Sequence, residues 1–216
     1  MTITFPRPFP FDGLFTDDCA FDLVRNQTRN LTGSGSPDVA DVAPPYWVGK
    51  WSTRVVSRQD LGEWEAWLSS LRGRLRLFKG RPNRARWPMS RPRGFDGLLV
   101  SGEPFTGLGN LDDIGESRDS ITIDALPNGL VLAPGDWFSI PVGSRQHIHR
   151  ITEGGTVASN EVTVSCEPII MPGVVADIAV RLDTPYCEMN LIEKPTVTRN
   201  ATSGGTISFS GQQILI

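Results

Sequence analysis

From Ser120 onward, short runs of alternating apolar and polar residues are separated by turn sequences. Gly154-Gly155 and Ser203-Gly-Gly205 each stand between two such runs, as the loops of β-hairpins do. About six runs follow one another at roughly 8–12-residue intervals, which is typical of a β-sandwich or a barrel. Earlier in the chain, Trp47 and Trp51 share the parity of a strand with an aromatic face. We therefore expect a mainly β fold, specifically a β-sandwich.

One segment has the periodicity of a helix instead. Its apolar residues recur at steps of three and four and form one stripe: Leu61, Trp64, Trp67, Leu68 and Leu71. Asp60 and Glu63 have the spacing of a helix start, and Gly73 suits the end. The pattern predicts one helix at about residues 60–72 that packs on a sheet. The expected core residues are Trp64, Trp67, Leu68, Leu71 and Trp137.

Two stretches lack such periodicity. Residues 1–45 are rich in Pro, Gly, Asp and Asn, and Thr32–Pro37 has the composition of a flexible loop. We expect residues 1–45 to be an extended N-terminal segment or arm. Residues 46–216 would then form one β-sandwich domain with a long loop insertion at about 80–118. Loops of that length within a domain are usually functional or disordered.

The composition agrees with a folded, strand-rich protein. The chain has 216 residues, of which 39% are hydrophobic, and its 22 Gly and 17 Pro suit many turns between short strands. No apolar run reaches the roughly 18 residues of a membrane span, and the first residues do not resemble a signal peptide. We therefore expect a soluble protein made in a cytoplasm. Its three cysteines should be buried free thiols, with a Cys166–Cys187 disulfide as the alternative.

The net charge of −3 is unevenly distributed. We call residues 72–93 the basic segment, because they hold nine basic residues and no acidic one. The rest of the chain has the other 12 basic residues and all 24 acidic ones, a net charge of −12. The basic segment could bind nucleic acid, contact the acidic surface of a neighbouring copy, or be a solvated loop. The acidity of the whole protein favours the contact between copies over nucleic acid.

Candidate chemistry is sparse. His147 and His149 would share one face of a strand, and Asp136 or Glu161 could complete a metal site with them. The spacing of a known metal site is absent, so we expect a polar, solvent-facing pair. Nucleophile-elbow and phosphate-loop motifs are also absent.

Carboxylate pairs of the kind that cleave glycosides could form between residues distant in sequence. Asp112, Asp113 and Glu188 are candidates by elimination. No motif supports them. We therefore expect no enzymatic activity, no metal and no cofactor.

Three segments in order resemble the distal tail protein family of long-tailed, siphovirus-type bacteriophages, specifically its ring-forming belt domain. Residues 64–74 contain aromatic and leucine residues that end in Leu-Arg-Gly, and residues 122–138 form a strand–turn–strand pattern before Gly-Asp-Trp-Phe. The third segment begins at His147-Ile-His-Arg-Ile-Thr152 and ends at Val180-Arg-Leu182. Their order and spacing over residues 64–182 carry the resemblance, since no single motif is specific.

The resemblance implies a β-sandwich with one packed helix, a homo-oligomeric ring of six copies, and a place in the virion tail. Partners would be the tail tube protein and the tail-tip or baseplate hub proteins, with no membrane and no nucleic acid beyond the genome passing through the ring. The expected subunit contacts are Arg72, Arg74, Arg76, Lys79, Arg81, Arg84 and Arg86. Alternatives are another tail-tip component, such as a baseplate hub or tail-completion protein, and a carbohydrate-binding β-sandwich.

Overall fold

The computed structural model describes residues 3–11, 14–16, 19–31, 37–83, 85–200 and 204–215. Within them the fold is mainly β with one helix, which confirms the predicted fold class. The elements in chain order are β1 (Ala20–Leu31), β2 (Pro37–Ser52), α1 (Arg58–Ser70), β3 (Phe78–Gly80), β4 (Leu99–Val100), β5 (Glu103–Pro104), β6 (Leu108–Ile114), β7 (Ser120–Asp124), β8 (Val131–Leu132), β9 (Trp137–Val142), β10 (Arg145–Glu153), β11 (Gly155–Thr156), β12 (Val162–Glu167), β13 (Ile178–Arg181), β14 (Cys187–Leu191), β15 (Thr196–Asn200) and β16 (Gly204–Gln213).

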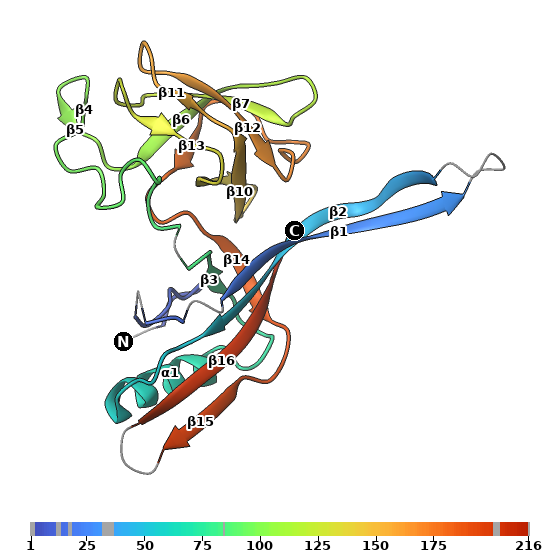
Figure 1. The fold of residues 1–216 in the computed structure, drawn as a ribbon, viewed down its shortest axis with the longest axis vertical. Helices are drawn as coiled ribbons and strands as arrows, with labels where there is room; N and C mark the ends of the chain where they lie inside the picture. Colours follow the sequence, from blue (N-terminus) through green and yellow to red (C-terminus); the bar gives the residue numbers. More distant parts are fainter. Residues whose placement is uncertain are drawn as a thin grey trace.

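The strands are divided between an open sheet and a closed barrel (Figure 1). The open sheet has the order β1-β2-β16-β14-β3, and β15 pairs with β16. The barrel has the order β10-β12-β7-β6-β13-β9. The chain leaves the open sheet after β3 and returns in β14, and these two strands pair with each other. The barrel is thus an insertion between two neighbouring strands of the open sheet.

This division differs from the one sandwich expected for residues 46–216. The barrel encloses its own core, which includes Leu111, Ile121, Ile123, Phe138, Ile140 and Val164. A second core lies between the open sheet and α1. Closing six short strands into a barrel buries their apolar face without a second facing sheet and leaves no open edge. Strands of a sandwich and strands of a barrel show the same alternation of apolar and polar residues, so the sequence does not distinguish the two folds.

The range expected as a loop insertion, 80–118, contains a barrel strand. Within it, β4 and β5 form a small ribbon, and β6 pairs with both β7 and β13. In β6 only Gly109 and Leu111 are buried, and one of these has no side chain. This strand therefore carries almost no apolar alternation from which it could be recognised.

The helix α1 packs on β16 and begins two residues earlier than predicted. Ser57 is the N-cap: its Oγ accepts a hydrogen bond from the Asp60 backbone N–H (3.1 Å) and donates one to the Asp60 carboxylate (2.8 Å). Asp60 thus lies in the first turn, where a carboxylate favours the positive end of the helix dipole. The helix ends before Arg72 and Gly73, both with positive φ.

The tryptophans of the helix lie in the second core. Trp64, Trp67, Leu68 and Leu71 are buried, and the Trp67 Nε1–H donates a hydrogen bond to the Pro8 carbonyl (2.7 Å). That bond ties the N-terminal segment to the helix.

The barrel and the open sheet meet at an aromatic junction. Trp47 of β2 donates from Nε1 to the backbone carbonyl of Ile148 in β10 (2.9 Å). Its ring also contacts that of Trp137, with 4.8 Å between ring centroids. Trp137, expected in the core, is only partly buried and packs at this junction. Arg145 of the barrel pairs with Glu188 of the open sheet at 2.7 Å. Hydrogen bonds, an ion pair and apolar contacts therefore join the two parts.

The three cysteines are free thiols, so the alternative of a Cys166–Cys187 disulfide is wrong. Cys166 lies in the barrel core and Cys187 in the second core. Burial raises the pKa of Cys166 to about 12 and also raises that of Cys187. Both are therefore unreactive packing residues at neutral pH.

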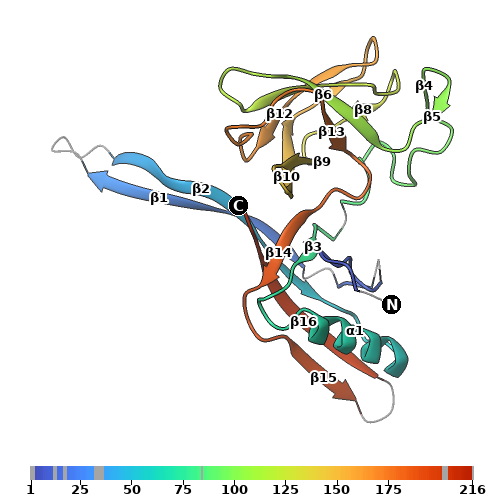
Figure 2. The same ribbon diagram turned by 180° about the vertical axis from the view of Figure 1, so that it is seen from behind.

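The strands β1 and β2 form a long antiparallel hairpin that extends well beyond the rest of the molecule (Figures 1 and 2). We call its outer part, residues 26–30 and 38–44, the hairpin arm. Residues 20–31 and 37–45 of the expected extended N-terminal segment therefore lie in paired strands. Of the predicted flexible tract Thr32–Pro37, residues 32–36 lie outside the described residues, and Pro37 begins β2.

Candidate functional site

The histidine pair is buried, so the expectation of a solvent-facing pair is wrong. His147 is 2% exposed and His149 is 1% exposed. They pair in register with Ile140 and Phe138 of the barrel core, and His149 stacks on the Phe138 ring. His147 Nε2 hydrogen-bonds the Leu215 carbonyl (3.0 Å), and His149 Nδ1 hydrogen-bonds that of Pro168 (2.7 Å). Burial lowers the pKa of both imidazoles, that of His149 to about 4. Both rings are therefore neutral at pH 7.

The two imidazoles line a largely apolar cavity of about 360 Å³ at the root of the hairpin arm. Its other walls come from residues 41–45, the loop 168–172 and the C-terminal residues Gln213 and Leu215. His149 Nε2 has no hydrogen-bond partner among the described residues.

The acids proposed as further metal ligands do not complete a site with the histidines. Across the described ranges, no three metal-binding side chains gather in one cluster. The buried carboxylate of Asp136 accepts hydrogen bonds from the backbone N–H groups of Ala133 and Met89, each 2.7 Å long. Burial raises its pKa despite these bonds. The Asp136 carboxylate therefore links the turn at Ala133 to the loop at Met89. Glu161, the other proposed ligand, is exposed.

The candidate glycosidase carboxylates have separate environments. Asp112 and Asp113 are exposed on β6 of the barrel. Glu188 is buried in β14 and paired with Arg145. Glu188 is thus a junction residue, and the other two belong to the barrel surface.

The basic segment comprises the turn after α1, β3 and the loop that follows. Arg72, Arg74 and Arg86 are exposed, Arg76, Lys79 and Arg81 are half-buried, and Arg84 lies outside the described residues. Three of these cations stack on aromatic rings: Arg76 on Phe5, Lys79 on Tyr186 and Arg86 on Trp87, at 4.4, 4.6 and 4.4 Å from the ring centroids. Arg74 donates a hydrogen bond to the Ile192 carbonyl. Side chains held in this way keep their charge at fixed positions.

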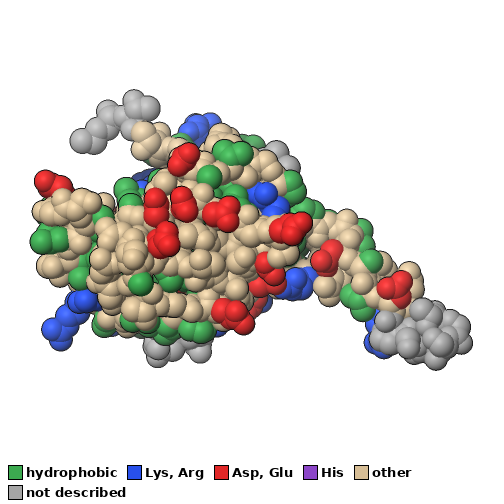
Figure 3. All heavy atoms as spheres, turned by 90° about the horizontal axis from the view of Figure 1, so that it is seen from above, with side chains coloured by type: hydrophobic (Ala, Val, Ile, Leu, Met, Phe, Trp, Pro, Cys, Tyr) green, Lys and Arg blue, Asp and Glu red, His purple; other side chains and the backbone are tan. Residues whose placement is uncertain are grey.

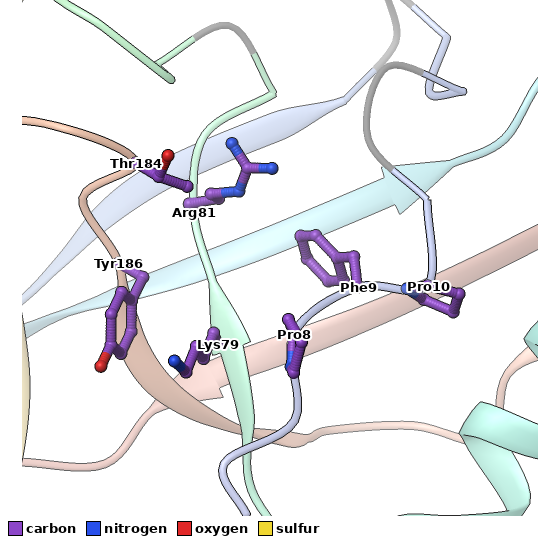
Figure 4. A pocket seen from close by; sticks show the side chains of 7 residues that line it. All are labelled: Pro8, Phe9, Pro10, Lys79, Arg81, Thr184 and Tyr186. Carbon is purple, nitrogen blue, oxygen red and sulfur yellow. The ribbon is translucent and has the colours of Figure 1, made fainter.

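Lys79 and Arg81 line a small pocket of about 230 Å³, shown in Figure 4. They come from β3 and its continuation, whereas Thr184 and Tyr186 come from the segment that leads into β14. Residues 8–10 of the N-terminal segment form the opposite wall. Among the described residues, none that line this pocket is acidic. We call it the basic pocket.

Acidic residues are concentrated on the barrel. Residues 99–182 hold eleven acidic and four basic residues, a net charge of −7. Seen from above, the barrel end of the molecule presents a group of acidic side chains with few basic ones among them (Figure 3). The exposed acids of the barrel include Asp112, Asp113, Glu116, Asp119, Glu153 and Glu161. The molecule therefore has an acidic barrel and a basic segment outside it.

The hairpin arm is exposed on both faces. Residues 27–30 and 38–44 are all exposed, including Val39 (53%) and Val42 (70%). β1 is also the last strand of the sheet order, so its outer backbone groups have no strand partner among the described residues. Near the root of the arm, Arg25 forms an ion pair with Glu167 of the barrel (2.9 Å).

Sequence reasoning did not find the hairpin arm or the cavity at its root. One signal for the arm was present: the Gly- and Ser-rich tract 32–36 stands between two stretches that pair in the structure. The pattern of apolar alternation is missing, because residues on both faces of the arm are exposed. The cavity combines residues from four distant segments and left no local signal.

The one helix among the described residues is too short and too polar to cross a membrane. No protein-family model matches the chain, and no curated protein is significantly similar to it in sequence.

Proposed function

We propose that this protein is a noncatalytic structural subunit of a virion, a distal tail protein that assembles into a ring between the tail tube and the tail-tip or baseplate proteins. The single observation that carries the proposal is the hairpin arm. The family and the ring of six follow from the sequence resemblance over residues 64–182. The arm and the charge distribution support the more general part of the proposal, namely assembly with other subunits.

The arm supports assembly because an isolated two-stranded hairpin is at best marginally stable in water. Its exposed valines and the unpaired edge of β1 would favour contact with another protein. A ring neighbour that covers the arm would bury the exposed valines and pair with the open edge of β1.

The charge distribution also supports assembly with other subunits. A basic segment and an acidic barrel on one chain suit head-to-tail contacts between identical copies, which close into a ring when the rotation permits. Such contacts join two different surfaces, so neither surface has to be complementary to itself.

Native mass spectrometry and electron microscopy of the purified full-length chain test the proposal. We expect a closed ring of six copies, and labelled antibody should locate the protein at the distal end of tails in virion preparations. Three copies or one per tail would favour a baseplate hub or tail-completion protein. A monomer at all concentrations, absent from virions, would exclude a ring subunit.

A further inference from the structure

We infer that the basic pocket receives an acidic side chain from the barrel of a second copy of this chain. The inference rests on the proposed ring and deepens it, because it names the two surfaces that meet. The contact joins the Lys79 ammonium to a carboxylate of the neighbour.

The pocket is held in shape by backbone pairing. Arg7 donates its N–H to the Leu77 carbonyl (3.1 Å) and accepts from the Lys79 N–H (2.8 Å), so the N-terminal segment lies along the edge of β3. On the other side of β3, Lys79 is paired in register with Glu188 of β14. The pocket walls are therefore the two segments that flank β3, and its shape exists before any ligand binds.

The side chains of the pocket suit a carboxylate. Lys79 lies in β3 and Arg81 directly follows its end, and the side chains of both line the pocket (Figure 4). The Lys79 Nζ lies 4.6 Å from the centre of the Tyr186 ring, which holds the ammonium at the pocket. Burial raises the pKa of Tyr186, so its hydroxyl remains a hydrogen-bond donor at neutral pH. Pro8 and Phe9 supply an apolar wall for the methylene groups of an inserted side chain.

The size of the pocket favours an inserted side chain over a separate small molecule. Its volume of about 230 Å³ lies below the roughly 300–1,000 Å³ of typical small-molecule sites.

The barrel of a second copy is the matching source of carboxylates. With a net charge of −7, it offers several exposed acids at the end of the molecule seen in Figure 3. Nucleic acid also carries anionic groups, but the same acidic barrel would repel it.

Zero-length carbodiimide cross-linking of the assembled protein tests the inference. The reagent couples amines to carboxylates in direct contact, and the chain contains only three lysines: Lys50, Lys79 and Lys194. Rings assembled from mixed unlabelled and ¹⁵N-labelled chains distinguish cross-links between copies from those within one copy. We expect mixed-label peptides that join Lys79 to an acidic residue of residues 99–182.

The possible outcomes separate the inference from the proposed function. A ring in which Lys79 couples to no barrel carboxylate of another copy overturns the inference and leaves the proposed function standing. Absence of any ring overturns both. Loss of the Lys79 cross-link on adding a single-stranded oligonucleotide, with the ring intact, would assign the pocket to phosphate and overturn the inference too.

Charge variants provide an independent readout. Lys79→Arg keeps the charge and removes the reactive amine, so the ring should persist while the cross-link disappears. Lys79→Glu with Arg81→Glu should raise the protein concentration required for assembly about tenfold or more, because like charges then meet at the contact. Arg91→Glu with Arg93→Glu makes the same charge change in the basic segment outside the pocket and should have little effect. Equal effects of the two double variants, with unchanged circular dichroism, would contradict a role for the pocket.

Discussion

The barrel and the hairpin arm are both made of antiparallel strands. They differ in whether the strand edges are paired and in whether the apolar side chains are buried. In the barrel, each strand pairs on both sides, and the inward side chains fill one core. In the arm, two strands pair only with each other, and residues on both faces are exposed. The body of the protein thus folds around complete cores, whereas the arm extends from it without one.

This difference separates what the chain needs to fold from what it needs to assemble. Removing side chains from the barrel should reduce stability, because each one is part of a close-packed interior. Removing side chains from the arm should leave the stability of one copy unchanged, since these groups contact water. An effect on assembly alone would then identify the arm as a surface for partners.

The largest expected effect on stability is in the barrel core. Phe138 is fully buried, and its ring stacks on that of His149 with 5.2 Å between centroids. Phe138→Ala should lower the free energy of unfolding by about 3–5 kcal/mol, measured by urea denaturation. Val131→Ala, at a partly exposed position of β8, is the control and should change it by less than about 1 kcal/mol. Equal effects of the two substitutions would mean that the barrel lacks a tightly packed core.

A smaller effect should appear on acidification, at the side of the barrel that faces the arm. The pKa of His149 is about 4 in the folded chain, below its ordinary value of 6.5, so the unfolded chain binds the proton more readily. The stabilising contribution is therefore present above pH 6.5 and is lost as the pH falls toward 4. Between pH 8 and pH 5 the loss should be about 2 kcal/mol.

The matched variant for this test is His149→Gln, which does not titrate and should lose most of that pH dependence. Burial also lowers the pKa of His147, with the same sign, so a smaller slope should remain in the variant. Denaturation curves at pH 8, 6 and 5 measure both chains. Parallel pH profiles for the two would show that His149 is not the titrating group.

The parts of this fold that the sequence predicts are those where burial follows a simple period. The helix was located to within two residues, because Leu61, Trp64 and Trp67 all face the open sheet. Its start was misplaced, since Ser57 and Asp60 together form the cap that Asp60 and Glu63 were expected to form. The choice between sandwich and barrel depends on which strands close on each other, and alternation along one strand carries no such information.

The candidate site was less accessible to sequence reasoning. Clustering of Lys and Arg identified the basic segment, but the basic pocket also needs Tyr186 and Pro8–Pro10, which are distant in the chain. The sequence places the two histidines at the surface, because the residues that bury them, such as Phe138 and Leu215, reach them only through tertiary contacts. No periodic pattern predicted that β10 would be covered on both sides.

Substitutions in the hairpin arm should have the smallest effect on stability and a large effect on assembly. Val42 of the arm and Val175 of the barrel segment are exposed to nearly the same extent, 70% and 67%. Val42→Ser and Val175→Ser should each change the free energy of unfolding by less than about 0.5 kcal/mol, since both valines contact water in the single chain. If neighbours cover the arm, Val42→Ser should shift native mass spectra from the ring toward monomers, whereas Val175→Ser should leave the ring intact. Unaltered assembly in Val42→Ser, and also in Val39→Ser, would mean that the arm side chains do not contribute to contacts between copies, and the ring would then have to depend on the charged surfaces alone.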